Sequence, residues 1–130
     1  MLHLQDIESG YGAGQVLFGV SLSVPAGRVV SLMGRNGMGK TTTIRTIMGQ
    51  LPLTAGRISR FGNDQPNKLP FQIARLGLGL VPEGRQIFSN LDVTENLKTF
   101  YRPPRVDGGS HWHYERVLDL FPRLAERRDH

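Results

Sequence analysis

The sequence predicts an α/β fold, and three observations lead to it. Residues 2–8 and 16–24 alternate apolar and polar side chains, which is typical of half-buried strands. Residues 28–33 (RVVSLM) form a short, mostly apolar run of the kind found in a strand buried on both faces. From Lys40 onward, apolar residues recur at helical spacing. A buried strand that runs into a glycine-rich turn and then into a helix indicates an α/β arrangement.

Short local signals place the remaining elements. Gly49 is positioned to end the helix that begins near Lys40, and Asp92 with Thr94 provides the chemistry of a helix start. Pro122 is expected to end or kink a final helix that begins near Trp112. The other expected elements are a strand at 57–61, a helix at 70–76, a strand at 78–82, a helix from 92 to 101 and a loop over 102–110.

Composition is that of an ordinary soluble domain. The chain has 130 residues, of which 38% are hydrophobic and 21% charged, and it contains no cysteine. This length allows one domain. The start of the chain lacks the basic head and apolar core of a secretory signal, and no apolar run is long enough to span a bilayer. Without cysteine there is no disulfide framework, which fits a reducing, cytoplasmic compartment.

The positive charge of the chain is spread along its length. The net charge is +5; residues 1–65 carry six basic and three acidic groups, and residues 66–130 carry ten and eight. No basic patch of the kind that binds nucleic acid is formed, so we expect no nucleic-acid partner. Phosphate ligands or an anionic membrane surface suit a mild positive charge.

Residues 34–41 (GRNGMGKT) match the phosphate-loop pattern GxxxxGK[ST]. Glycines allow the backbone to bend so that successive N–H groups point inward around phosphates, and the helix N-terminus adds partial positive charge. Lys40 is expected to reach the β- and γ-phosphates, the Thr41 hydroxyl to ligate Mg²⁺ and Thr42 to add a phosphate hydrogen bond. The expected nucleotide contacts of this segment are Gly34, Arg35, Asn36, Gly37, Met38, Gly39, Lys40, Thr41 and Thr42.

Two other interpretations of this loop are weighed against nucleotide binding. A glycine-rich turn that merely caps a helix is the plain alternative, and the strand before and helix after the loop argue against it. A GTPase should also contain DxxG and NKxD, and neither occurs, since Asn67-Lys68 is followed by Leu69-Pro70. A small nucleotide kinase stays open because its lid motifs are loose.

Several blocks together resemble the ATP-binding subunits of ABC transporters, within the P-loop NTPases. GRNGMGKTT, LGLVPEGRQIF, LDVTENL and FPRLAERR are most similar to the branched-chain amino-acid uptake ATPases, and they span nearly the whole chain. The resemblance implies one incomplete nucleotide-binding domain over residues 1–130. Its antiparallel β part and phosphate-loop core would cover 1–91, and the start of the helical subdomain would cover 92–130.

The resemblance also implies roles for matched residues. Tyr11 matches the aromatic residue that stacks on adenine, although a half-buried tyrosine at a strand end is the alternative. Glu83 stands where most relatives carry a glutamine that contacts Mg²⁺ and the attacking water, so it is the second catalytic candidate beside Lys40. Segment 83–91 would lie near the coupling helix of the membrane subunit. Its candidate contacts, equally plausible as ordinary loop residues, are Arg85, Gln86 and Phe88.

The family implies ATP and Mg²⁺ as cofactors and a defined set of partners. These are transmembrane permease subunits, a second ATP-binding subunit and, indirectly, a periplasmic binding protein, with the chain on the inner face of the cell membrane. Import of branched-chain amino acids is the leading function. A urea or short-amide importer and a nucleotide-binding module without turnover are the alternatives.

Three motifs that ABC ATPases need do not occur in these residues. The glycine pair Gly108-Gly109 is not the LSGGQ-type signature, Asp119 is followed by Leu120 rather than glutamate, and His130 has no preceding strand that would place it as the switch histidine. Because the P-loop and a later aspartate hold Mg²⁺ jointly, we expect no efficient hydrolysis by this chain alone. The chain is expected to be the N-terminal half of a longer subunit, with the strand at 28–33 unpaired on at least one side.

Other conspicuous residues receive plain interpretations. His111 and His113 flank Trp112 in a glycine-rich segment, but two histidines with no third ligand nearby make a weak metal site, and ordinary loop chemistry is favoured. Arg127 and Arg128 are solvated charges near a helix end. No Ser/His/Asp set and no carboxylate pair stands out.

Overall fold

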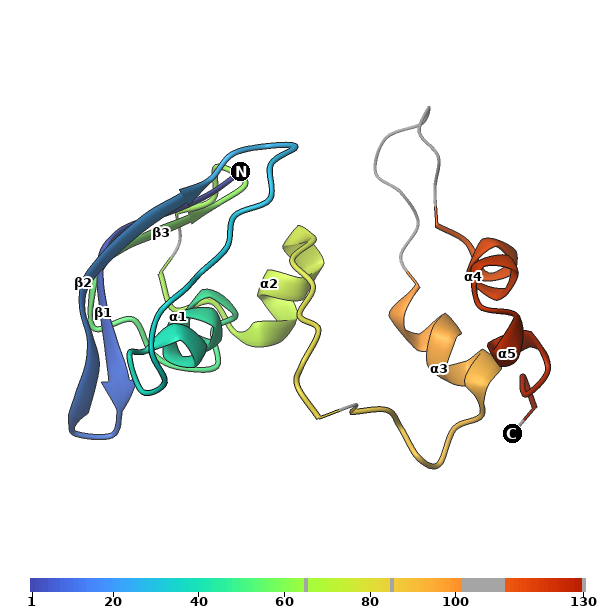
Figure 1. Cartoon of the computed structure of the whole chain (residues 1–130). Helices are drawn as coiled ribbons and strands as arrows, with labels where there is room; N and C mark the ends of the chain where they lie inside the picture. Colours follow the sequence, from blue (N-terminus) through green and yellow to red (C-terminus); the bar gives the residue numbers. More distant parts are fainter. Residues whose placement is uncertain (65, 85, 102–111, 130) are drawn as a thin grey trace. The chain divides into compact units, whose positions relative to one another are not determined.

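The computed structural model describes residues 1–64, 66–84, 86–101 and 112–129 (Figure 1). The chain forms two compact units, Met1–Val81 and Pro82–His130. The loop expected over 102–110 lies outside the described residues. No helix in the described ranges is both long and apolar enough to cross a membrane. The subdomain division expected at residue 91 stays a prediction, since it concerns family subdomains rather than compactness.

A three-stranded antiparallel sheet forms one layer of the first unit. The strands β1 (Leu2–Tyr11), β2 (Gly14–Val24) and β3 (Ala55–Arg60) lie in the order β2-β1-β3. A tight turn joins β1 to β2, with Tyr11 paired to Gly14. The alternating patterns therefore predict the first two strands correctly, because each presents one face to the core and one to solvent. The strand expected at 57–61 is also confirmed.

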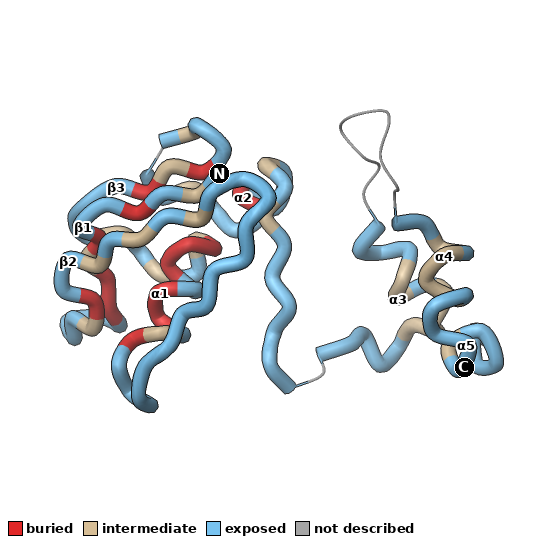
Figure 2. Tube along the Cα trace, turned by 45° about the horizontal axis from the view of Figure 1, so that its top comes forward, coloured by how far each residue is buried: buried red, intermediate tan, exposed pale blue. Residues whose placement is uncertain are grey.

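The helix that follows the glycine loop packs against this sheet. Helix α1 (Lys40–Ile47) contributes Ile47 to a core that it shares with the strands, and the buried positions appear in red in Figure 2. The core residues contributed by the strands are Leu4, Ile7, Leu17 and Ile58. A register shift between Leu4 and Ile7 explains why the buried residues of β1 depart from strict alternation. As expected, α1 ends just before Gly49.

Two predicted strands are not formed, and both predictions are wrong. Residues 28–33 and 78–82 are in neither a strand nor a helix. Val29 is 97% exposed, Met33 86% and Val81 94%, so these apolar segments are open to solvent. An apolar run forms a buried strand only where neighbouring strands supply hydrogen bonds and cover both faces. No described strand lies beside either segment. Residues 28–33, expected to be unpaired on at least one side, thus pair with none of the described strands.

Local helix signals are confirmed in both units. Helix α2 (Pro70–Leu76) has the predicted bounds. In the second unit, α3 (Val93–Phe100) begins with the predicted chemistry: Asp92 Oδ1 accepts from Glu95 N at 2.7 Å, and Glu95 Oε2 accepts from Asp92 N at 3.1 Å. Pro122 ends helix α4 (Tyr114–Leu120) and opens the short α5 (Pro122–Ala125). No described residue of this second unit is buried.

Candidate nucleotide site

The glycine loop runs over 34–39 directly into the N-terminus of α1. Gly37 and Gly39 adopt φ angles of +84° and +85°, a left-handed conformation that glycine adopts without strain. Residues 34–38 are exposed, whereas Gly39 is buried against the sheet. Because helix N-termini carry unpaired N–H donors and partial positive charge, an exposed loop at this end of α1 is suited to an anion.

Lys40 closes the glycine loop on itself. Its Nζ donates to the carbonyl oxygens of Gly34 at 2.7 Å and Arg35 at 2.8 Å. An ammonium group has three donors, so these two bonds leave one for a ligand. A phosphate oxygen bound here would accept a hydrogen bond from the positively charged Lys40 ammonium. The loop and Lys40 together therefore have the donors and the charge that a triphosphate needs.

The threonines after Lys40 face different surroundings. Thr41 is exposed in the first turn of α1, so its hydroxyl oxygen is open to a ligand and is of the hard type that Mg²⁺ prefers. Thr42, by contrast, is buried. The predicted contact of Thr42 with phosphate therefore stays a prediction. Among the described residues no group of three acidic or histidine side chains could hold a metal by itself. Within this loop the Thr41 hydroxyl is the candidate donor to Mg²⁺.

Tyr11 lies at the end of β1 and reaches the exposed side of α1. Its ring is 45% exposed, and its Oη accepts a hydrogen bond from Arg45 Nη1 at 3.2 Å. The Thr42 side chain lowers the pKa of the phenol most. Burial, the next largest effect, raises the pKa, and the hydrogen bond and positive charge of Arg45 lower it further. The structure thus brings Tyr11 close to α1, the helix that follows the glycine loop, as a role in base stacking requires.

Two polar anchors beneath α1 were not anticipated from the sequence. Arg60, at the end of β3, is only 3% exposed, and its Nε and Nη2 donate to the carbonyls of Ile47 at 2.9 Å and Thr46 at 3.4 Å. Burial lowers the pKa of this guanidinium. Thr46 Oγ1 lies 2.9 Å from Ser9 Oγ on β1. These contacts hold the C-terminal end of the helix whose other end carries Lys40.

The residues matched near the second unit's start lie in an exposed segment. Glu83 and Gln86 are both exposed, and Arg85 lies outside the described residues. The Phe88 ring stacks on Phe100 of α3, with centroids 5.8 Å apart. Roles for these residues in Mg²⁺ binding or permease docking remain predictions.

Asn96 ties this segment to α3. Its Oδ1 accepts from Phe88 N at 3.0 Å, and its Nδ2 donates to the carbonyls of Phe88 at 3.0 Å and Leu91 at 2.9 Å. One side chain thereby satisfies backbone groups at both ends of the segment 88–91. A polar residue on a helix gives no sequence signal for such contacts, so its role was missed.

Replacing Asn96 by alanine should release the segment 88–91. Each lost hydrogen bond contributes about 1 kcal/mol, which corresponds to roughly fivefold more frequent local opening. Amide hydrogen exchange followed by mass spectrometry measures this opening at Phe88 and Leu91. Thr99→Ala is the matched control, because the Thr99 hydroxyl donates to the carbonyl of Glu95 in its own helix. Equal protection in the two variants would contradict the role of Asn96.

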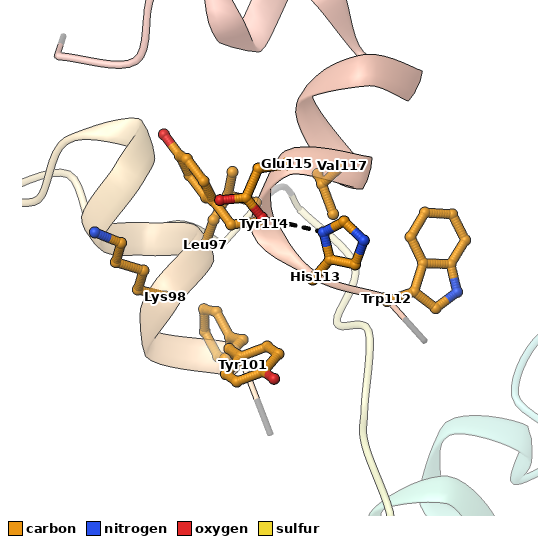
Figure 3. Close-up of a pocket in the computed structure, with 9 residues that line it drawn as sticks. Leu97, Lys98, Tyr101, Trp112, His113, Tyr114, Glu115 and Val117 are labelled. Atoms are coloured by element: carbon orange, nitrogen blue, oxygen red, sulfur yellow. Dashed lines mark hydrogen bonds and ion pairs between the residues drawn. The ribbon is translucent and has the colours of Figure 1, made fainter. Parts of the chain in front are cut away.

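A hollow of about 620 Å³ lies in the second unit (Figure 3). Its charged side chains already have partners: Glu115 Oε2 lies 3.1 Å from His113 Nδ1, and Lys98 lies over the Tyr114 ring at 5.6 Å. The other lining residues are Leu97, Phe100, Tyr101, Trp112 and Val117. Most of this surface is apolar, and it has no glycine loop.

The histidines that flank Trp112, for which ordinary loop chemistry is favoured over a metal site, are described only in part. His113 caps α4, since its Nδ1 lies 3.3 Å from Arg116 N, and no group of three potential ligands is found within the described part of the chain. His111 and His130 lie outside the described residues, as does Gly108-Gly109. Asp119 lies inside helix α4 rather than at the end of a strand.

Comparison with known proteins supports the interpretation of the loop. A family model described as ABC transporter matches residues 17–129. The branched-chain amino acid transport ATP-binding protein BraG of Pseudomonas aeruginosa is 37% identical over 98% of this chain and 54% of its own length. The lipopolysaccharide export ATP-binding protein LptB of Escherichia coli is 38% identical over 74% of this chain and 40% of its own.

Solved structures show the same fold. A structure described as the ATP binding subunit of an ABC transporter superposes with a TM-score of 0.78 at 31% identity, covering 98% of this chain and 52% of the other. A nucleotide-free ATP-binding cassette from an ABC transporter gives a TM-score of 0.73 at 27% identity, covering 99% and 56%. The fold is that of a P-loop NTPase. The chain belongs to the ABC transporter family, and it spans about half the length of the curated relatives it matches.

Proposed function

We propose that this chain binds Mg²⁺-ATP through its glycine loop, as part of an ATP-binding subunit of an ABC transporter. The observation that supports this most is the loop itself: left-handed glycines lead into an exposed helix N-terminus, with the Lys40 ammonium held across the loop. Lys40 and the loop N–H groups would hold the β- and γ-phosphates, and Thr41 would ligate Mg²⁺. Tyr11 would stack on the adenine.

Bound ATP would drive the closure of two such subunits, and its hydrolysis would transfer the γ-phosphoryl group to water. Glu83 is our candidate for orienting the attacking water. We do not expect these residues alone to hydrolyse ATP efficiently. Asp119 lies in a helix, whereas the P-loop mechanism needs an aspartate that shares Mg²⁺ with the loop threonine. Binding without efficient turnover is therefore the activity we expect of this chain. The residues proposed for nucleotide contact are Tyr11, Gly34, Arg35, Asn36, Gly37, Met38, Gly39, Lys40, Thr41 and Thr42.

For the transported substrate we propose branched-chain amino acids, taken up rather than exported. Similarity to BraG over nearly the whole chain supports this. Export proteins of comparable identity match shorter stretches, among them LptB and the Nod factor export ATP-binding protein I of Rhizobium meliloti, which is 36% identical over 78% of this chain. Permease subunits, a second ATP-binding subunit and, indirectly, a periplasmic binding protein would be the partners, on the cytoplasmic face of the membrane. Urea or a short amide is the alternative cargo.

Calorimetric titration with Mg²⁺-ATP tests the proposal, with phosphate release assayed on the same samples. Lys40→Ala removes a charge-assisted contact of about 1.5–3 kcal/mol, so affinity should fall by roughly ten- to a hundredfold. Lys98→Ala, which removes an exposed lysine from the second unit, is the matched control and should bind like the original chain. Equal affinity of the Lys40→Ala variant, or binding of DNA in place of ATP, would refute nucleotide binding by this loop.

A further inference from the structure

Tyr11 is bonded by a side chain of helix α1, and this contact suggests a role for Arg45. Arg45 donates from Nη1 to Tyr11 Oη at 3.2 Å, across a separation of 34 residues. Thr42, three residues before Arg45 on the helix, lowers the pKa of the same phenol. Residues three apart on a helix are neighbours on its surface, so the phenol lies over the face of α1 that carries Thr42 and Arg45, and Arg45 bonds it.

Arg45 is free to serve this contact. Its side chain is exposed, and no carboxylate among the described residues lies within ion-pair distance of it. Tyr11 is 45% exposed, so nothing buries its ring from both sides. A half-exposed aromatic ring otherwise turns about its side-chain torsions. The bond from Arg45 to the hydroxyl restricts that turning and leaves the flat faces of the ring for a ligand.

We propose that Arg45 is a positioning residue that holds the Tyr11 ring in place to stack on the base of ATP. The inference rests on the proposed nucleotide function and adds a residue to it. The phosphates are bound by the glycine loop and Lys40, whereas the base is bound by a ring that Arg45 orients. Loss of Arg45 therefore affects recognition of the base and leaves recognition of the phosphates unchanged.

Comparing Mg²⁺-ATP with Mg²⁺-tripolyphosphate separates these two parts. Tripolyphosphate carries the phosphate chain without base or sugar, so it reports on the loop alone. In Arg45→Ala the ring must be ordered upon binding, which should weaken ATP by about three- to tenfold and leave tripolyphosphate affinity unchanged. Tyr11→Phe keeps the ring and removes the hydroxyl, so it should lose as much ATP affinity as Arg45→Ala. The double variant should be no worse than either, and Arg45→Lys should recover part of the loss.

Titration of the phenol in the free protein gives a second readout that needs no ligand. The contacts with Thr42 and Arg45 lower the pKa of Tyr11, so Arg45→Ala should shift its ionisation to higher pH. The absorbance change that disappears in Tyr11→Phe identifies this tyrosine among the three in the chain. A mere loss of fold would not shift one tyrosine and spare the binding of tripolyphosphate.

Each outcome has one meaning. Loss of ATP affinity with retained tripolyphosphate affinity, together with the shifted titration, supports the inference. An equal loss of affinity for ATP and tripolyphosphate in Arg45→Ala would show that the Arg45 charge acts on the phosphates. Unchanged ATP affinity would show that the contact with Tyr11 does not contribute to binding. Either result overturns the role of Arg45 but leaves the proposed nucleotide function standing. If the unmodified chain binds no ATP, the proposed function fails as well.

Discussion

Replacing Gly39 by alanine should destabilise the first unit and abolish phosphate binding together. Gly39 has a φ of +85°, and an alanine Cβ there would lie 2.8 Å from Leu17 Cδ2, in the core. A left-handed conformation costs a residue with a Cβ about 1–2 kcal/mol. Crowding a packed core adds about 1–3 kcal/mol. Unfolding in urea, followed by circular dichroism, should show a lower midpoint, and calorimetry should show no binding of Mg²⁺-ATP.

Gly37→Ala is the matched control for this substitution. Gly37 has nearly the same φ, +84°, but an added Cβ would meet no atom within 4 Å. This variant should therefore lose only the conformational part of the stability. The difference between the two urea midpoints measures the stability lost when the added Cβ at position 39 crowds Leu17. Equal destabilisation of both variants would mean that the contact with the core has no energetic effect.

Arg60→Ala should also be strongly destabilising. The guanidinium is buried, and its Nε and Nη2 bond the carbonyls of Ile47 and Thr46 at the end of α1. Hydrogen bonds from charged groups contribute about 1.5–3 kcal/mol each, and alanine leaves both a cavity and two less satisfied carbonyls. We expect a loss of about 2–4 kcal/mol in the free energy of unfolding, measured by urea denaturation.

Two further variants separate the causes of that loss. Arg57→Ala removes an exposed arginine from the same strand and should change stability by less than about 0.5 kcal/mol. Arg60→Met fills most of the volume without donors. Since Nη1 of Arg60 has no hydrogen-bond partner, methionine also removes an unsatisfied group and should lose less than alanine. If Arg60→Ala were as stable as Arg57→Ala, the anchor beneath α1 would have no role in stability.

Features that depend on neighbours in the chain were predictable from the sequence. The bounds of α2, the capping residues of α3 and the two strands β1 and β2 follow from helix caps and side-chain alternation, which act over a few residues. The glycine loop was predictable for the same reason. Its spacing places the glycines and Lys40 around one turn of backbone, whatever surrounds them.

Features that depend on distant partners were not predictable. The run at 28–33 indicated a buried strand and 78–82 a further strand, but a strand needs a neighbour to pair with, and none of the described strands lies beside them. The contacts of Arg60 with α1, Asn96 with 88–91 and Arg45 with Tyr11 join residues 13, 8 and 34 positions apart.

The sequence by itself determined that this chain has a phosphate loop, two strands before it and a resemblance to the family to which it belongs. Each of these depends on the order and spacing of residues within one segment. Only the tertiary structure decided which polar side chains hold the phosphate helix and the Tyr11 ring, and that two apolar segments stay exposed. Hydrogen bonds and burial depend on which atoms are in contact, and the packing of the sheet against α1 determines these contacts.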